Sequence, residues 1–247
     1  MNRLSGTVSR RDVLRSLAAA GLLAASAGTL SACGTGRHGL AADSAASAGA
    51  ASAASAAASG PVPVPTPGTV VMIIRHGEKP DGSHKGIGPD GQKDKAALTE
   101  AGHARADRLV GLFDPAPGAL RPGLVRPSAL YAANATTGGE GERTRETLAP
   151  LAARLAIPVN TTFGKGQESA LVAQVLARPA PTLICWQHGE IPAIVAAFGH
   201  LSPTPPYKWP GKRFDMVWTL TASATGWTFA QVPELVMPGD RTTVIAD

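Results

Sequence analysis

The chain has 247 residues, of which 4% are aromatic and 17% charged, while 28 are Gly and 21 are Pro. These averages indicate a folded part that is diluted by segments of low complexity. The net charge is +5, but the first 32 residues carry +3 of it, so the remainder lacks the basic bias that binding to nucleic acid requires. The two cysteines, Cys33 and Cys185, are too few for a disulfide framework or a cysteine-based zinc site. No apolar run reaches the roughly 20 residues of a membrane-spanning helix.

Residues 1–33 have the pattern of an export signal. The segment Ser9-Arg10-Arg11-Asp12-Val13-Leu14 resembles a twin-arginine signal, and a stretch rich in Ala and Leu follows it over residues 17–30. This stretch runs into Leu30-Ser31-Ala32-Cys33, which resembles the lipobox of bacterial lipoproteins. The resemblance implies that Cys33 is acylated and that the protein is exported by the twin-arginine route. A lipid anchor would then hold it to a membrane, on the periplasmic or extracellular face of the cell envelope.

Residues 34–68 are predicted to form a tether. Ala42–Gly60 consists almost entirely of Ala, Ser and Gly, whose side chains bury too little apolar area to offset chain entropy. Pro61–Pro67 alternates Pro with other residues, which favours a stiff polyproline II spacer. Residues 69–247 remain as one domain, large enough for a substantial core.

Strands alternate with helices along residues 69–247. Strands are predicted at 70–74, 129–133, 159–163 and 182–186, helices from Thr99 to before Asp114 and at 143–155, 169–177 and 191–201, and a hairpin from strands at 216–220 and 226–230. Pro150 strains the helix at 143–155 and suggests a kink or a position in an early first turn. This order indicates an α/β fold with a mostly parallel sheet. Cys185 lies in the middle of a strand, where a buried structural thiol is expected.

Two of the predicted buried strands end in the same tripeptide. The first runs into Arg75-His76-Gly77-Glu78, and the strand at 182–186 runs into Gln187-His188-Gly189-Glu190. Ligand sites of open α/β sheets lie beyond the carboxyl ends of the strands, so His76 and His188 are expected to face one pocket. A glycine after each histidine allows the backbone or a ligand to come close.

Arg143 opens the helix that follows the second strand, and it adds a second arginine to this pocket. Two arginines and two histidines suit a phosphoryl group, whose oxygens bind the forked donors of arginine. A neutral imidazole can attack phosphorus in line, which divides one hard displacement into two easier ones. A nearby carboxylic acid must then protonate the leaving oxygen.

With these residues in view, the chain resembles the histidine phosphatase superfamily, which includes cofactor-dependent phosphoglycerate mutase. The resemblance covers nearly all of residues 69–247. The motifs that carry it are Arg75-His76-Gly77-Glu78, Leu98-Thr99-Glu100-Ala101-Gly102, Arg143-Thr144-Arg145-Glu146-Thr147, Ile157-Pro158-Val159-Asn160 followed by Glu168, and Gln187-His188-Gly189. The resemblance implies a three-layer α/β/α sandwich like that of phosphoglycerate mutase.

The resemblance also implies roles for individual residues. His76 is expected to be the nucleophile that becomes phosphohistidine, while Arg75, Arg143 and His188 bind the transferring phosphoryl group. Small-molecule phosphate monoesters are then the expected substrates, hydrolysed without a cofactor or a metal ion.

The resemblance leaves open which carboxylate is the acid and which further residues bind substrate. Glu168 is the first choice for the acid, and Glu190 is its rival because a more distant branch of the superfamily keeps its acid directly after the second histidine. For Glu168 the plain alternative is a carboxylate that favours the helix macrodipole. Glu78 and Lys79 are secondary candidates for binding substrate, although Glu78 can instead orient an arginine.

Two other interpretations stay open at this point, and a third is disfavoured. One is a non-catalytic lipoprotein that binds phosphorylated or anionic ligands in the same pocket. Another is a metal hydrolase built on His76, Glu78, His188 and Glu190. A phosphoglycerate-type mutase is disfavoured, because it requires a recycled bisphosphorylated cofactor that is not expected outside the cytoplasm.

Three loops have no counterpart in the motifs. Residues 80–95 are long and polar, and are either a mobile lid or a solvated insertion. Residues 134–142 lack the Ser-Pro pair that is common in the family before the second arginine. Residues 207–215 bring Lys208, Trp209, Lys212 and Arg213 near the same end of the sheet, and are interpreted as an exposed loop before the last hairpin.

Overall fold

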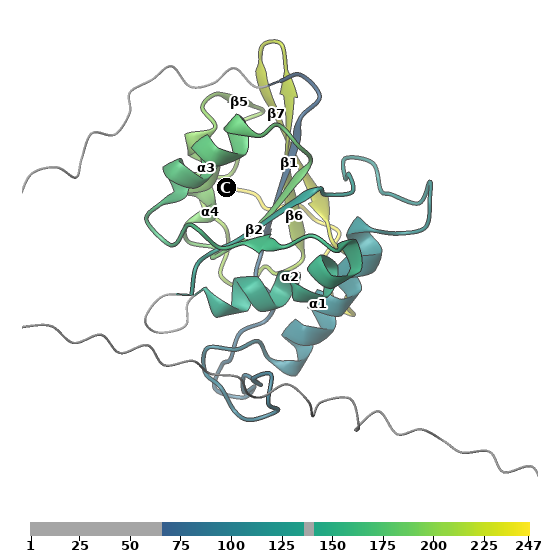
Figure 1. Ribbon diagram of the computed structural model, residues 1–247, viewed down its shortest axis with the longest axis vertical. Helices are drawn as coiled ribbons and strands as arrows, with labels where there is room; N and C mark the ends of the chain where they lie inside the picture. Colours follow the sequence, from purple (N-terminus) through teal and green to yellow (C-terminus); the bar gives the residue numbers. More distant parts are fainter. Residues whose placement is uncertain (1–65, 136–140) are drawn as a thin grey trace, which may run out of the picture. The chain divides into compact units, whose positions relative to one another are not determined.

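The computed structural model describes residues 66–135 and 141–247 (Figure 1). The predicted export signal, the lipidation site Cys33 and most of the tether lie outside the described residues, as does the middle of the 134–142 loop. Within the part that is described, no helix has the length and apolar character needed to span a membrane.

The described residues form strands and helices in the predicted alternation. The strands are β1 (Val70–Arg75), β2 (Ala129–Ala132), β3 (Val159–Asn160), β4 (Thr182–Trp186), β5 (Leu201–Ser202), β6 (Met216–Ser223) and β7 (Gly226–Pro233). The helices are α1 (Glu100–Phe113), α2 (Glu142–Leu155), α3 (Glu168–Ala177) and α4 (Ile191–Ala197).

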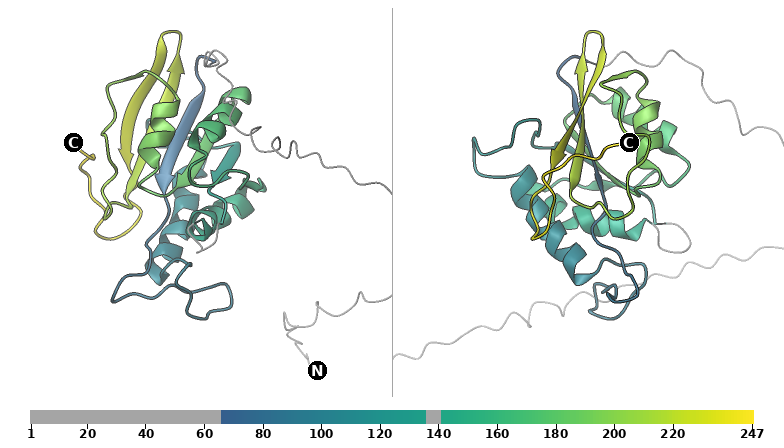
Figure 2. Two further views of the ribbon diagram at one scale, coloured as in Figure 1. Left: turned by 90° about the vertical axis from the view of Figure 1, so that its left-hand side faces the viewer. Right: turned by 180° about the vertical axis from the view of Figure 1, so that it is seen from behind.

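One mixed sheet joins the strands in the order β3-β2-β4-β1-β6-β7-β5. β3, β2, β4 and β1 run parallel to one another, whereas β6 is antiparallel to β1 and pairs with β7 in a hairpin. The tip of this hairpin projects at the top of both views of Figure 2. The prediction of an α/β fold with a mostly parallel sheet is therefore confirmed.

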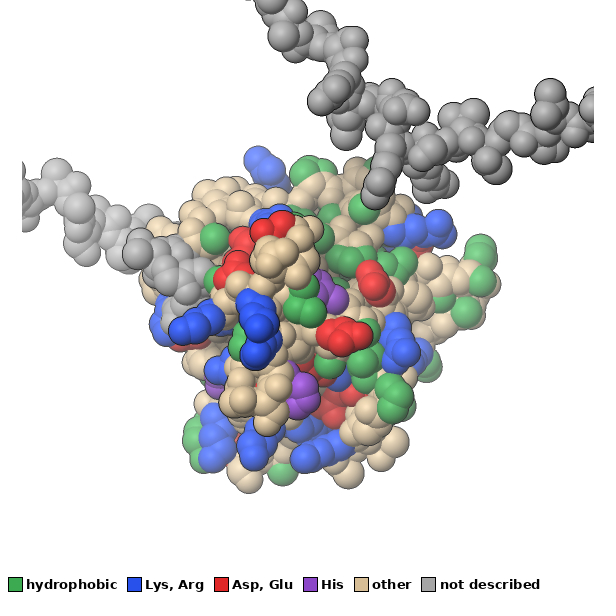
Figure 3. Space-filling model, turned by 90° about the horizontal axis from the view of Figure 1, so that it is seen from below, with side chains coloured by type: hydrophobic (Ala, Val, Ile, Leu, Met, Phe, Trp, Pro, Cys, Tyr) green, Lys and Arg blue, Asp and Glu red, His purple; other side chains and the backbone are tan. Residues whose placement is uncertain are grey.

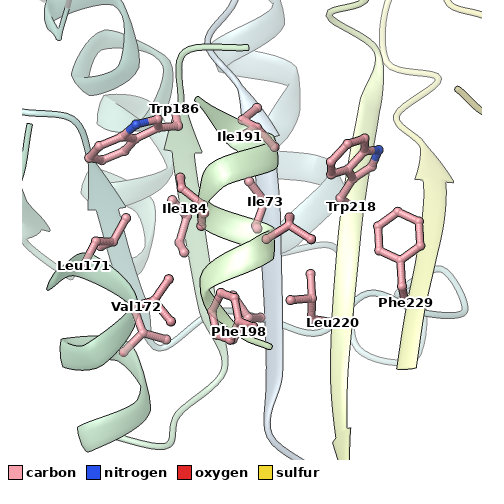
Figure 4. Packing of buried hydrophobic residues seen from close by; sticks show 14 of the residues in the cluster. Ile73, Leu171, Val172, Ile184, Trp186, Ile191, Phe198, Trp218, Leu220 and Phe229 are labelled. Atoms are coloured by element: carbon pink, nitrogen blue, oxygen red, sulfur yellow. The ribbon is translucent and has the colours of Figure 1, made fainter. Parts of the chain in front are cut away.

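Helices cover both faces of the sheet, because side chains of successive strand residues point to opposite faces. Val71 and Ile73 pack with α3 and α4, while Met72 and Ile74 pack with α1 and α2. Figure 4 shows the first of these layers, in which Ile73 and Ile184 of the sheet face the two helices. The arrangement is the predicted three-layer sandwich, and β1 lies near its centre.

Two glycines bring the start of α1 against the turn that follows β1. A Cβ on Gly77 would lie 2.9 Å from the carbonyl oxygen of Gly102, and a Cβ on Gly102 would lie 2.6 Å from that of Glu78. Thr99 is the N-cap of α1, as predicted, and its hydroxyl accepts a hydrogen bond from the amide of Gly102. The close approach fixes the backbone turn that directly follows His76.

Several boundaries differ from the predictions. β3 ends at Asn160, and α4 ends at Ala197 because Gly199 has a φ of +89° and turns the chain into β5, which pairs with β7. Pro150 lies within α2, which continues past it to Leu155. Cys185 is buried, as predicted.

Candidate active site

Arg75 and His76 lie at the carboxyl end of the central strand β1, where both side chains are almost fully buried. β1 pairs with β4 on one side and β6 on the other, so neither residue reaches an open edge of the sheet. Figure 3 looks at the molecule from below, toward this end of the sheet, and shows Lys and Arg side chains gathered with His and acidic ones. A buried arginine beside a buried histidine requires a specific reason, because burial of charge is costly.

The guanidinium of Arg75 is held through one nitrogen, Nη1, and presents its other two nitrogens toward the candidate site. Its Nη1 donates hydrogen bonds to the carbonyl oxygens of Gly211 (2.7 Å) and Arg213 (3.2 Å), and its Cζ lies 3.7 Å from the centroid of the Phe214 ring. Its Nε and Nη2 are buried and have no hydrogen-bond partner in the described part of the chain. Two adjacent donors of a guanidinium match two oxygens of a phosphoryl group.

The ring of His76 is oriented by its own backbone turn. Nδ1 lies 2.7 Å from the carbonyl oxygen of Gly77, and since a carbonyl only accepts, Nδ1 carries the proton. The neutral tautomer then has a lone pair on Nε2. The Gly77 amide in turn donates to Thr147 Oγ1, whose hydroxyl donates to the Arg143 carbonyl, so α2 holds this turn in place.

Burial and positive neighbours keep the His76 ring uncharged. Desolvation is the largest effect and lowers its pKa from 6.5 to about 3, with Arg75, Arg143 and His188 contributing in the same direction. Burial also lowers the pKa of Arg75, to about 10, which leaves it charged at neutral pH. The site therefore combines a neutral imidazole with a cationic guanidinium.

The pH dependence of kcat/KM should reveal this neutral ring. A histidine pKa lowered to about 3 means that the nucleophile stays deprotonated through the mildly acidic range, so its protonation should not reduce kcat/KM near pH 6. Steady-state rates with an aryl phosphate between pH 3 and 8, corrected for ionisation of the substrate, check this. A fall in kcat/KM on the acid side, centred near pH 6.5 and matching the titration of His76 seen by NMR, would contradict this prediction.

His188 follows β4 and lies beside the same group. Burial lowers its pKa, and the charges of Arg75 and Lys79 lower it further. Its Nε2 would be 3.4 Å from a Cβ placed on Gly211, the residue whose carbonyl holds Arg75. The glycine after His188, Gly189, has open space where a Cβ would be, so the expected close approach is found at Gly77 and not here.

Arg143 comes from the first turn of α2. Its Nη1 donates to the carbonyl oxygens of Lys95 and Ala96, which ties the end of the 80–95 loop to this helix. Its charge also lowers the pKa of both Arg75 and His76. The structure thus brings Arg75, His76, Arg143 and His188 into one electrostatically connected group.

The two candidate acids have different surroundings. Glu168 is buried at the start of α3, and its Oε1 accepts hydrogen bonds from Trp186 Nε1 (3.2 Å) and the Gly166 amide (3.1 Å). Glu190 forms an ion pair with Lys165 at 2.9 Å, and its charge raises the pKa of His188. Glu168 thus connects α3 to β4, whereas Glu190 acts electrostatically on the candidate site.

The carboxylate of Glu78 binds Arg105, with an Nη2 to Oε1 distance of 2.8 Å, and this ion pair argues against a role in binding substrate. Arg105 is buried and also contacts Glu234 and Asp240 at 2.7 Å each. Lys79 is exposed beside this turn. Over residues 66–135 and 141–247, no group of three His, Cys, Asp or Glu is arranged to hold a metal ion.

The 207–215 segment differs from the prediction of an exposed loop. It is not simply an exposed loop, because Trp209, Arg213 and Asp215 are buried and Gly211 and Phe214 contact Arg75. Sequence patterns carried no signal for Phe214 as a site residue. Thr147 was also missed, although its position four residues after Arg143 places both on one helix face.

Comparisons with known proteins give only distant similarities. No family model and no curated protein matches the chain. Among solved structures, the protein histidine phosphatase SixA complexed with tungstate is 18% identical, with a TM-score of 0.44 over 67% of this chain and 97% of that one. A mycobacterial glucosyl-3-phosphoglycerate phosphatase is 14% identical, with a TM-score of 0.41 over 67% and 97% of the two chains. At these values the similarity does not assign an activity to this chain.

Proposed function

We propose that this protein is a phosphatase of the histidine phosphatase type, which hydrolyses phosphate monoesters through a phosphohistidine on His76. The observation that carries the proposal is the pairing of Arg75 with His76. A buried guanidinium, two of whose nitrogens have no hydrogen-bond partner among the described residues, lies next to a buried imidazole that is neutral and donates its Nδ1 proton to a carbonyl. Desolvated donors of this kind stabilise phosphoryl oxygens more strongly than donors in water.

The first step forms a bond between phosphorus and Nε2 of His76 while the ester P–O bond breaks. Arg75, Arg143 and His188 bind the three phosphoryl oxygens. The proton stays on Nδ1 of His76 and is donated to the Gly77 carbonyl, whose oxygen stabilises the positive charge of the phosphorylated ring. An acid gives a proton to the leaving oxygen. Water then attacks phosphorus, the P–N bond breaks, and the same carboxylate takes the proton from water.

The test is a trapped intermediate. The purified protein, treated with a chelator, is mixed with a ³²P-labelled phosphate monoester and quenched in alkali, in which phosphohistidine is stable. We expect label on the peptide that contains His76 and release of that label in acid. A protein that turns over substrate without a label at any time point, or that loses all activity with the chelator, contradicts the mechanism. Phosphate binding without turnover favours the non-catalytic binder.

For the acid we favour Glu190, because its charge acts on His188. Both candidates have a partner, but that of Glu190 is Lys165, an exposed side chain, whereas Oε1 of Glu168 accepts hydrogen bonds from Trp186 and Gly166 that connect α3 to β4. Changing Glu190 to Gln should lower kcat about 100-fold for an alkyl phosphate, whose leaving group needs a proton. With p-nitrophenyl phosphate, whose leaving group does not, the loss should be below about tenfold. Glu168→Gln is the matched control and should affect both substrates alike. If Glu168→Gln instead shows the larger loss with the alkyl phosphate than with p-nitrophenyl phosphate, Glu168 is the acid.

We also propose that the enzyme is exported and lipid-anchored. The support lies in the sequence of residues 1–33, with Arg10 and Arg11 before the apolar stretch and Cys33 after it. Residues 34–68 would then be the tether and residues 69–247 the catalytic domain. Loss of membrane association in a Cys33→Ala variant, measured by cell fractionation, tests the anchor.

A further inference from the structure

We propose that Phe214 is a positioning residue that, with the carbonyl groups of Gly211 and Arg213, sets the guanidinium of Arg75 for an oxyanion. The inference deepens the proposed function and rests on it. Phe214 does not come from any of the motifs at the ends of β1 and β4. It belongs to the segment that leads into β6, well over a hundred residues after Arg75 in the chain.

The contacts of Arg75 divide its guanidinium into a held part and a part left for a ligand. The Phe214 ring covers one face at 3.7 Å, and both carbonyl groups bind the same nitrogen, Nη1. Nε and Nη2 remain buried and unpartnered among the described residues. Since these two nitrogens lie on one edge of the guanidinium, the three contacts orient that edge without using its donors.

An aromatic ring suits this role better than a carboxylate. A carboxylate would accept the two donors that a phosphoryl group needs and would cancel the charge that attracts it. A ring face attracts the guanidinium through its quadrupole and leaves every N–H free. The Phe214 ring also lies 6.2 Å from the His76 ring, centroid to centroid, so it lies beside both the guanidinium and the candidate nucleophile.

The segment that carries Phe214 is itself fixed. The Arg213 carbonyl accepts hydrogen bonds from both Arg75 Nη1 and Trp209 Nε1. The Arg213 side chain is buried, forms an ion pair with Asp215 at 2.6 Å and donates to the Thr243 carbonyl. A guanidinium held by a rigid support is preorganised, which lowers the cost of binding a ligand.

The experiment compares Phe214→Leu, which removes the ring, with Phe214→Tyr, which keeps it. Phe198→Leu is the matched control, because it removes a ring that packs on Trp227 at the far end of α4. We expect Phe214→Leu to weaken tungstate binding and to lower kcat/KM about tenfold each, with Tyr within about threefold of the parent protein. Phe198→Leu should lower the Tm and leave the affinity for tungstate unchanged.

The outcomes for the positioning role of Phe214 can be told apart from those for the proposed function. Equal tungstate affinity in Phe214→Leu and the parent would overturn it, as would a Tyr variant as impaired as the Leu variant. If the parent neither binds tungstate nor hydrolyses any ester, the proposed function fails. The NMR signal of the Arg75 guanidinium protons then decides the positioning role. A ring-current shift that disappears in Phe214→Leu supports it, and an unchanged signal refutes it.

Discussion

Changing His76 to Asn is expected to lower kcat at least ~10³-fold, because it removes the nucleophile and with it the two-step route. Asn keeps a polar side chain of similar size, and its amide can still donate to the Gly77 carbonyl that binds Nδ1. The fold and the oxyanion contacts of Arg75 should therefore survive. We expect this variant to bind tungstate and to form no phosphorylated peptide.

The measurement is single-turnover hydrolysis of an aryl phosphate, together with a tungstate titration and a thermal melt. Because His76 is buried, a melt close to that of the parent is needed to separate lost chemistry from lost structure. Hydrolysis at the parent rate in a folded His76→Asn variant would remove His76 from the mechanism.

The second large effect is expected on stability, from changing Arg105 to Met. Arg105 is buried in α1 and lies within 2.8 Å of oxygens from three carboxylates, those of Glu78, Glu234 and Asp240. Removing the cation leaves buried carboxylates without a counter-charge, which costs about 3–5 kcal/mol of unfolding free energy. Urea denaturation measures it. Arg108→Met, an exposed arginine one turn further along α1, is the control and should cost less than about 1 kcal/mol.

The loss of unfolding free energy caused by Arg105→Met should grow with pH. Glu234 is fully buried, and burial raises its pKa from 4.5 to about 8, opposed by Arg105. A carboxyl group with a raised pKa in the folded state stabilises the fold when protonated, and this contribution is lost as the pH rises toward the folded pKa. Without Arg105 the pKa rises further, so the difference in unfolding free energy between the parent and Arg105→Met should be larger at pH 9 than at pH 5. Equal destabilisation at both pH values would contradict the electrostatic origin.

The role of Glu78 illustrates the limit of reading a motif in one dimension. As a neighbour of His76 it was a candidate for binding substrate, but the backbone turn at Gly77 directs its carboxylate to Arg105. Arg105 in turn binds residues more than a hundred positions away, which no local pattern reveals. The same applies to Phe214, which reaches Arg75 only because β6 pairs with β1.

The sequence by itself determined the layers and the edge of the sheet that carries the candidate site. Short β-branched runs such as Val70–Ile74 favour strands that are buried on both faces, and His-Gly at the end of two parallel strands lies at one edge of the sheet. Only the tertiary structure decided which side chains act on one another at that edge. Hydrogen bonds and charge interactions act within a few ångströms in space, so the state of His76 and the support of Arg75 depend on segments that folding, not chain order, brings together.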